Sequence, residues 1–438
     1  MPKRRFDGCG GGGGGRGRTA KPPRRHLYLV LDDWSIGYSI RKIDLSSDFD
    51  SEDSDQLTAA HGPISSNGKR RLPSAVFRFQ AQRGLPMYFA DAFDSKIMAM
   101  HPITPGINGM LPWVPERLVP VFDVRMRSVI FGPRQIPDLD DPIYIPVGGR
   151  LFALSTGSFQ LLYPPPGDND ESGSEEEEGW VWSWRQPPFK RKHVTAYTIH
   201  PDGRTIFISI KKRRSATTFT FDTAESALRD DCTWKQHGNW MLPFSGRAYF
   251  DSVLDAWVGL SRDSGTLGQL CSCDVVSTSP IPTLRSTICK ELFVENPVMR
   301  RVGATLLYMG NRSKFCLVGC ICIKDDSVDE IKDGYVGEMT DGSVGGANED
   351  SVHEMNDDPV GELNEDYEMN DDSGMNDSKL EEQHVSPHSG YFLRLKTFFL
   401  MYDKNGDLKT GKHIQVRCYD VPITVSESIR KHPVAFWM

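Results

Sequence analysis

The sequence predicts an all-β fold, a β-propeller of about six four-stranded blades with kelch-like spacing. A motif of strand, tight turn, strand, loop, strand and strand recurs along the 438 residues. A period of about 50 residues with four short strands per unit is typical of small sheets repeated radially around an axis. The copies are 51 to 60 residues apart and begin near Leu27, Met87, Ile143, Val194, Arg247 and Gly303.

The fourth copy shows most clearly why the pattern predicts strands. Apolar and polar residues alternate over residues 194–200, and Pro201-Asp202-Gly203 then supplies turn chemistry. Residues 205–210 and 217–222 are again rich in β-branched and aromatic side chains, which suit a pleated, half-buried surface. Gly, Asn or Asp stands at the turns of the other copies, because hairpin turns need positive φ. Their expected strands are 27–33 and 38–44; 87–93, 96–100 and 119–123; 143–147, 150–155 and 159–164; 247–251, 256–261 and 269–274; and 304–309, 314–320 and 391–402.

Two other architectures fit the same strands. An irregular β-sandwich, or two smaller β domains, would place strands at similar spacing. The number of blades is also open, since one misjudged copy would give five or seven. The diglycine Gly148-Gly149 precedes a strand cleanly in only one copy, so the repeat by itself does not exclude these arrangements.

Composition divides the chain into one folded domain and segments that we expect to be disordered. Residues 1–25 form a basic tail rich in Gly and Arg, and residues 26–438 form a single propeller. Residues 325–388 interrupt the last blade as an acidic low-complexity insertion, in which Glu354–Asp358 is repeated at Glu368–Asp372. Segments with so few large apolar residues cannot offset the entropy of ordering the chain.

The acidic insertion conceals the charge of the rest of the chain. Residues 325–382 hold 21 acidic and two basic residues, a net charge of −19, whereas the whole chain carries −8. The remaining residues therefore sum to +11. A basic body favours anionic partners, although runs of charge are often simply solvated.

Targeting signals and cysteine usage give an expected location. No stretch approaches the roughly 20 apolar residues of a membrane helix. The N-terminal residues lack the apolar centre of a secretory signal. We therefore expect the nine cysteines to be reduced thiols, in a protein of the nucleus or cytoplasm that is neither secreted nor in a membrane.

Short basic clusters supply the candidate contact residues. Clusters of this kind are typical of nuclear import signals or of contacts to anionic partners, and ordinary surface charge is the alternative. Residues 211–214 lie between two expected strands and should cap a hairpin in solvent. The candidates are Lys3, Arg4 and Arg5; Lys69, Arg70 and Arg71; Lys190, Arg191 and Lys192; and Lys211, Lys212, Arg213 and Arg214.

Signals for metal binding and catalysis are weak. Cys271 and Cys273 alternate on one strand, as do Cys320 and Cys322, and packing between blades suits them better than zinc, which favours pairs on turns. Residues 403–407 resemble a calcium loop only superficially, and their Asn-Gly pair predicts a type I′ hairpin instead. We expect no cofactor. No nucleophile elbow, P-loop or His-Glu-x-x-His motif occurs, but a site assembled across the central channel would be invisible in the sequence.

Three tryptophans alternate at Trp180, Trp182 and Trp184, which predicts one shared face of a strand. Packing between blades is one interpretation, because aromatic rings fill the space between twisted sheets. An anchor for a peptide or a sugar is the other.

Five stretches of the chain carry a family resemblance, at residues 24–34, 194–209, 238–260, 270–275 and 302–310. In these stretches the chain resembles a family of kelch-like proteins of unknown function that is expanded in cereal grasses. The resemblance implies a propeller-like fold and a plant origin, and it brings no catalytic or binding residues. Many plant kelch proteins carry an F-box, but the chain has no helical, Leu-rich segment of that kind near its N-terminus.

These observations predict a non-catalytic interaction scaffold for an unknown protein partner. A propeller enzyme or carbohydrate binder that uses the central channel is the first alternative. A nuclear factor that contacts nucleic acid through basic loops is the second, although a nucleic-acid partner is not our expectation. It would need a contiguous basic face joining residues 190–192 to residues 211–214.

Overall fold

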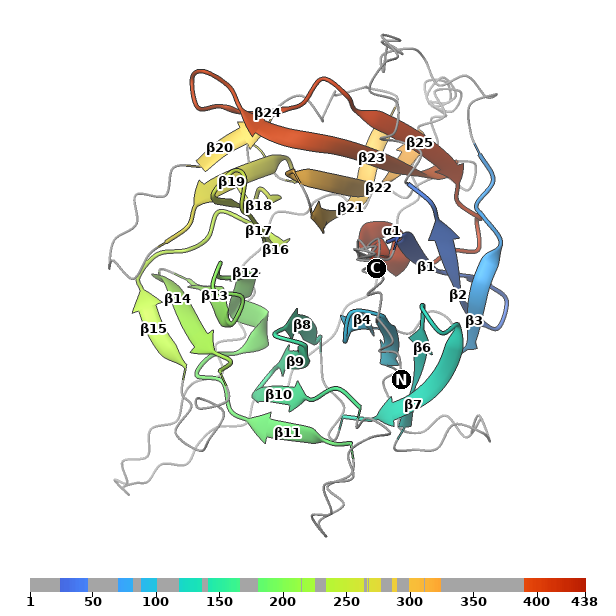
Figure 1. Ribbon diagram of the computed structural model, residues 1–438, viewed down its shortest axis with the longest axis horizontal. Coiled ribbons are helices and arrows are strands. Elements are labelled where there is room, and N and C mark those ends of the chain that lie inside the picture. The colour runs from blue at the N-terminus through green and yellow to red at the C-terminus, as the bar shows by residue number, and fades with distance from the viewer. Residues whose placement is uncertain are drawn as a thin grey trace, which may run out of the picture.

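The chain forms a ring of six β-sheets arranged as a β-propeller (Figure 1). This computed structural model describes residues 24–45, 70–81, 88–100, 118–135, 141–165, 180–213, 215–224, 234–263, 266, 268–276, 286–289 (backbone only), 299–310, 312–323 and 390–438. The predicted fold class and the count of six blades are confirmed. A sandwich, two β domains, and five or seven blades are excluded.

Each of the first three blades is an antiparallel sheet of four strands, ordered from the channel outward. Blade one holds β26 (Val434–Trp437), β1 (Leu27–Trp34), β2 (Gly37–Ile43) and β3 (Ala75–Gln80). Blade two holds β4 (Tyr88–Ala92), β5 (Lys96–Met100), β6 (Leu118–Asp123) and β7 (Ser128–Pro133). Blade three holds β8 (Ile143–Val147), β9 (Arg150–Ser155), β10 (Ser158–Leu162) and β11 (Trp182–Arg185).

The other three blades keep four principal strands, and two of them carry an added strand. Blade four holds β12 (Val194–Ile199), β13 (Thr205–Lys212), β14 (Ser215–Asp222) and β15 (Lys235–Gly238), with β16 (Gly246–Arg247) paired in parallel on the inner edge of β12. Blade five holds β17 (Tyr249–Asp251), β18 (Ala256–Leu260), β19 (Leu270–Asp274) and β20 (Ser286–Cys289). Blade six holds β21 (Met299–Gly310), β22 (Lys314–Ile323), β23 (Tyr391–Tyr402) and β25 (Gln415–Asp420), with β24 (Leu408–Thr410) also paired to β23. A 3-10 turn, η2 (Arg191–His193), precedes β12, and the helix α1 (Glu427–Lys431) precedes β26.

Blade one corrects the sequence prediction for the first copy. The strand that begins at Leu27 is the second strand of its blade, because β26 from the C-terminal residues pairs with the inner edge of β1. Leu27 pairs with Trp437 and Val30 with Val434. The ring is therefore closed by strands from opposite ends of the chain.

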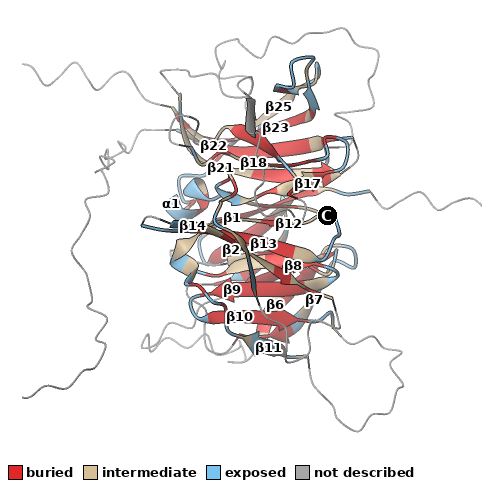
Figure 2. Ribbon diagram, turned by 90° about the vertical axis from the view of Figure 1, so that its left-hand side faces the viewer, coloured by how far each residue is buried: buried red, intermediate tan, exposed pale blue. Residues whose placement is uncertain are grey.

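Buried apolar side chains form clusters that combine neighbouring blades (Figure 2). Phe152 and Phe159 of blade three, for example, share a cluster with Ile208 and Phe221 of blade four. Trp257 of blade five is fully buried in a cluster that includes residues of blade four. Because both faces of each blade are apolar, each blade is covered only when its neighbours are in place.

Turns follow the predicted chemistry with one correction. Gly148 and Gly149 both have positive φ, at 59° and 72°, as a tight hairpin turn requires. The hairpin at residues 403–407 is also present, but the predicted type I′ form is wrong, since Gly406 has positive φ and Asn405 does not. The Asp403 carboxylate accepts hydrogen bonds from the Asn405 and Asp407 backbone N–H groups at 2.8 and 2.9 Å, which holds a wider loop.

The up-and-down order of strands gives the ring two distinct faces. The innermost strand of each blade begins at one face, which we call the start face, and the second strand returns to it. Connections between second and third strands, such as β13 to β14 and β22 to β23, therefore lie on the start face. None of the helices in the described part of the chain is long and apolar enough to cross a membrane.

Closure by β26 predicts a large stability cost for Phe436→Ala. Phe436 is 9% exposed and lies in the cluster that joins β26 to β1. Removing a buried phenyl ring should lower the free energy of unfolding by about 3 kcal/mol, measured by urea denaturation. Ile423→Ala, at a side chain that is 81% exposed, is the control and should change it by less than about 0.5 kcal/mol. Equal stability of the two variants would contradict closure through β26.

Candidate functional site

Two basic clusters that are separate in the sequence meet at the start face of blade four. Val194 at the beginning of β12 pairs with Ile210 near the end of β13, and Lys212 pairs with Ser215 at the tip of the β13–β14 hairpin. Residues 190–192 directly precede β12, so they lie beside this hairpin. The exposed cations at this position, called the basic edge, are Lys190, Lys192, Lys211, Lys212 and Arg213.

The pKa of His193 reflects the positive charge of the basic edge. Burial lowers the pKa of His193 below 6.5, and the charges of Lys192, Lys212 and Lys190 lower it further. The lysines of both sequence clusters therefore act on one imidazole. Like charges held this close favour an anionic group on this surface.

Arg191 lies in the same cluster but has a structural role. Its Nη2 atom is 3.1 Å from Oδ2 of Asp141, and its Nε–H donates to the Asp141 carbonyl oxygen at 2.8 Å. The Arg191 side chain is only 17% exposed. The Arg191 side chain therefore links the start of blade four to Asp141, which directly precedes blade three. We remove Arg191 from the candidate contact residues for this reason.

The remaining basic candidates do not join the basic edge. Arg70 and Arg71 are exposed, and the Arg70 backbone pairs with β25 of blade six, since its N–H donates to the Cys418 carbonyl oxygen at 3.0 Å. Blade six is separated from blade four by blade five. Lys3, Arg4, Arg5, Lys69 and Arg214 lie outside the described residues.

The paired cysteines pack between blades, as predicted. Cys271 and Cys273 are buried in the cluster that combines blades four and five. Burial raises the pKa of Cys271 to about 12 and that of Cys320 to about 11, so both thiols stay protonated at neutral pH. Among the described residues, no group of three or more His, Cys, Asp or Glu side chains could hold a metal ion.

The three tryptophans divide between the two interpretations. The Trp182 indole N–H donates to the Pro133 carbonyl oxygen of blade two at 3.0 Å, and Trp180 packs against the cluster between blades two and three. Trp184, however, is 58% exposed on the outer strand β11. Packing between blades is confirmed for Trp180 and Trp182, and Trp184 remains available as an anchor.

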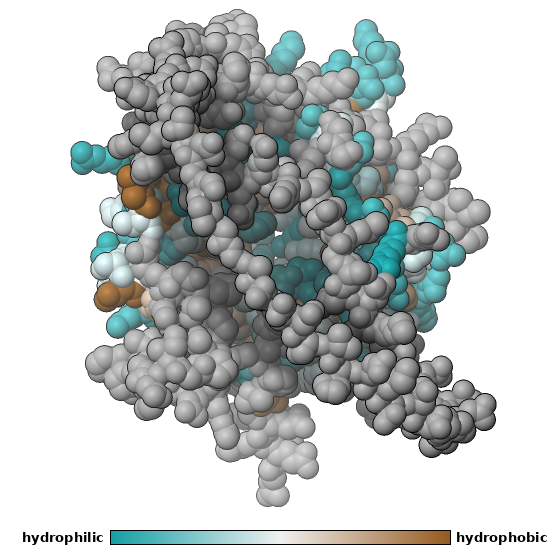
Figure 3. All heavy atoms as spheres, turned by 180° about the vertical axis from the view of Figure 1, so that it is seen from behind, coloured by the Kyte–Doolittle hydropathy of each residue, from teal (hydrophilic) through white to brown (hydrophobic). Residues whose placement is uncertain are grey.

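A second group of polar side chains lies at the centre of the ring, where sequence reasoning found no site. Arg247 of β16 has its Nη1 atom 3.7 Å from Oδ1 of Asp91 in β4, on the other side of the channel. The Arg247 guanidinium lies 4.7 Å from the ring centre of Tyr249. Hydrophilic residues surround the hollow at the centre of the face in Figure 3. We call Arg247, Asp91, Tyr197 and Tyr249 the channel cluster.

The surroundings of Arg247, Tyr197 and Tyr249 fix the protonation states of these three side chains. Burial alone would lower the pKa of Arg247, but Tyr249, Asp91 and Tyr197 outweigh burial and raise it above its ordinary value. Burial also raises the pKa of Tyr197 to about 12 and raises that of Tyr249. Near neutral pH the arginine is charged and both phenols are protonated, so these three groups can donate hydrogen bonds but do not exchange protons.

One sequence signal could have identified one residue of the channel cluster. Asp91 is the only charged residue of the expected strand 87–93, whereas Arg247 shares the expected strand 247–251 with Asp251. A lone charge in a short inner strand is costly unless it faces water or a partner.

Comparison with known proteins identifies the family of the chain. Residues 24–362 match the model of a family described as proteins of unknown function, DUF1668. The match covers most of the chain, so the chain belongs to this family. A search of curated proteins found no match. The expected resemblance is thus confirmed as membership in a family of unknown function.

The basic edge predicts a specific pH response at His193. The pKa of His193 is lower in the folded chain than in the unfolded chain, so the unfolded state binds the proton more tightly. The contribution of neutral His193 to the free energy of unfolding is therefore fully present above pH 6.5. It is lost as the pH falls from 6.5 through the lower pKa that His193 has in the folded chain. Lys212→Gln should raise the pKa of His193 toward its ordinary value, measured by an NMR titration of the imidazole.

Lys235→Gln is the matched control for this titration. Lys235 is exposed on β15 and pairs with Thr220, near the opposite end of blade four. It should leave the pKa of His193 unchanged. An equal response to both variants would contradict a local effect of the basic edge.

Proposed function

We propose that this member of the DUF1668 family is a non-catalytic interaction scaffold that binds an acidic segment of a protein partner at its basic edge. The observation that carries the proposal is the meeting of two basic clusters on one blade. We extend the proposal to a plant protein of the nucleus or cytoplasm with kelch-like repeats, as the sequence predicts.

The backbone that carries the lysines supports a binding role. β13 and β14 are paired along their full length up to Lys212 and Ser215, so the ladder holds the backbone of Lys211 and Lys212 in a fixed position. A partner then orders only side chains when it binds. Single exposed ion pairs contribute about 0.2–1 kcal/mol, so several together give an interaction that is moderate and sensitive to salt.

The placement of the other surface features favours a protein partner over nucleic acid. A nucleic acid needs a track of cations for successive phosphates and, for single strands, exposed rings on which bases stack. The cations at Arg70 and Arg71 lie at blade six, apart from the basic edge. The exposed rings in the described part of the chain belong to blades two, three and six and are those of Phe131, Tyr163, Trp184 and Tyr402. The basic edge is therefore compact, which suits a short acidic peptide.

The channel cluster supports a non-catalytic assignment, because its arginine and phenols hold their protons well above neutral pH. General acid–base catalysis needs a group whose pKa lies near the working pH. The cluster is better suited to binding than to proton transfer.

Charge reversal at the basic edge tests the proposed function. Proximity labelling in plant cells should give a reproducible set of protein neighbours for the full chain. The variant Lys211→Glu, Lys212→Glu should lose most of them, because two attractions become repulsions. Its matched control is Lys235→Glu, Lys404→Glu, which makes the same change in net charge at two exposed lysines away from the start face. This control should keep the neighbours.

Two outcomes would contradict the proposal. The first is an unchanged set of neighbours in the basic-edge variant, which would remove this surface from partner binding. The second is loss of the neighbours when nucleases are added to permeabilised cells before labelling, which would show that nucleic acid holds them.

A further inference from the structure

The channel cluster consists of groups that the described residues leave incompletely paired. β16 adds a strand on the inner edge of blade four, and Figure 1 shows β16 and β4 on different sides of the centre of the ring. The side chains of Arg247 and Asp91 remain 26% and 33% exposed although they lie deep between the blades. Water therefore reaches both of them through the channel.

The separation between Arg247 and Asp91 leaves hydrogen-bonding capacity unused. A guanidinium and a carboxylate that hydrogen bond approach to about 2.7–2.9 Å, whereas the nearest atoms of this pair are 3.7 Å apart. Within the described residues, no hydrogen bond is formed by the Arg247 guanidinium or by the Tyr197 and Tyr249 hydroxyls. A guanidinium carries five N–H donors, and leaving them unfilled is costly away from bulk water.

The composition of the cluster selects the chemistry of a ligand. Arg247 offers paired donors that match a carboxylate, and the two phenols add single donors. Asp91 accepts hydrogen bonds from hydroxyl or ammonium groups and repels a bare anion. The arginine and the aspartate together carry no net charge, so a ligand that combines one negative charge with donor groups satisfies both. A neutral polyol leaves the arginine unmatched, and a simple anion leaves the aspartate unmatched.

We propose that the channel cluster binds a small monoanionic carboxylate that also carries hydroxyl or ammonium groups, the class that includes sugar acids, hydroxy acids and amino acids. The carboxylate pairs with the free N–H groups of Arg247, and the hydroxyl or ammonium groups donate to Asp91. The Tyr197 and Tyr249 hydroxyls donate the remaining hydrogen bonds to the ligand. This site is independent of the basic edge and goes beyond the role in partner binding.

Ligand-detected NMR with three matched probes tests the site. D-Galacturonate carries both a carboxylate and hydroxyls, D-galactose lacks the carboxylate, and acetate lacks the hydroxyls. Galacturonate should give a saturation-transfer signal from the full chain that reaches a plateau at millimolar ligand concentration. The other two probes should bind at least about tenfold more weakly. Equal signals from all three, or none from galacturonate, would overturn the proposal.

Variants assign the site to the channel cluster. Arg247→Met should weaken galacturonate binding by at least about tenfold, because it removes the charge and keeps the length of the side chain. Arg204→Met, at a side chain that is 59% exposed on a turn of blade four, is the control and should bind as the parent chain does. Circular dichroism confirms that each variant is folded. Full binding by a folded Arg247→Met variant would overturn the assignment.

Asp91→Asn gives a second test that does not depend on the stability of the arginine variant. Loss of the carboxylate charge removes an acceptor for the hydroxyls and also removes the repulsion of a bare anion. The preference for galacturonate over acetate should therefore fall in this variant. An unchanged preference would show that Asp91 does not face the ligand and would overturn the proposed arrangement.

Discussion

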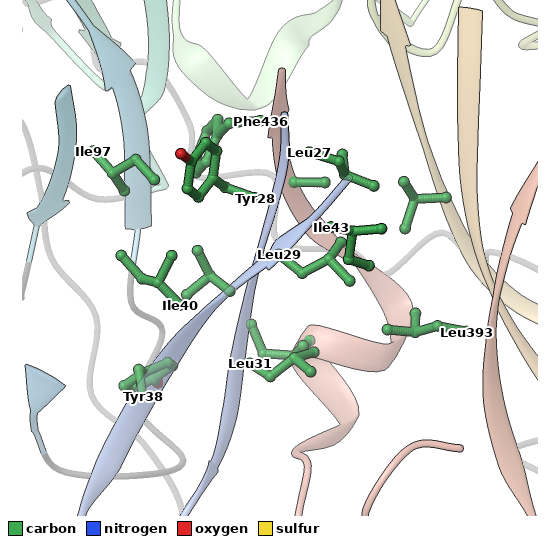
Figure 4. Packing of buried hydrophobic residues seen from close by; sticks show 14 of the residues in the cluster. Leu27, Tyr28, Leu29, Leu31, Tyr38, Ile40, Ile43, Ile97, Leu393 and Phe436 are labelled. Carbon is green, nitrogen blue, oxygen red and sulfur yellow. The ribbon is translucent and has the colours of Figure 1, made fainter. Parts of the chain in front are cut away.

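Closure of the ring is the constraint on which the rest of this structure depends. Each blade presents apolar side chains to both neighbours, so one open joint would expose two blade faces at once. β26 closes the joint by pairing with β1. Phe436 lies beside Tyr28 on one side of this pair, and Leu27 and Leu29 lie on the other side (Figure 4). The backbone makes room for this joint at Gly303, where a Cβ atom would come within 2.0 Å of the Lys431 carbonyl oxygen.

Once the ring is closed, topology decides which loops meet. Strand order alone brings residues 190–192 beside the β13–β14 hairpin, and it places residues 323 and 390, which flank the acidic segment, on the same start face. Carboxylates then fix individual turns to their neighbours. Asp251 accepts from the Val253 and Leu254 backbone N–H groups and from the Ser313 hydroxyl of the next blade at 2.6 Å, so one buried side chain joins a turn to an interface.

The sequence predicted the features that repeat and missed those that occur once. Alternation over residues 194–222 and the diglycine at Gly148 identify strands and turns because their signals are local. β26 is four residues long and pairs with a strand at the other end of the chain, and β16 is two residues long, so neither has a period to recognise. Arg247 and Asp91 come from blades four and two, which are separated by blade three, so their approach depends on how the blades are arranged around the ring. The number of blades fixes that relation, and no local spacing expresses it.

The two candidate sites use positive charge in opposite physical settings. The lysines of the basic edge stay hydrated, so their attraction for a partner is weak for each residue and falls with salt. Arg247 lies deep between blades, where a charge needs compensation from nearby groups. A lysine there could lose its proton, whereas a guanidinium stays charged and must be matched by Asp91, by the ring of Tyr249 and by whatever enters the channel. An arginine at this position therefore requires an anionic partner, which Asp91 supplies, whereas the hydrated lysines of the basic edge merely favour one.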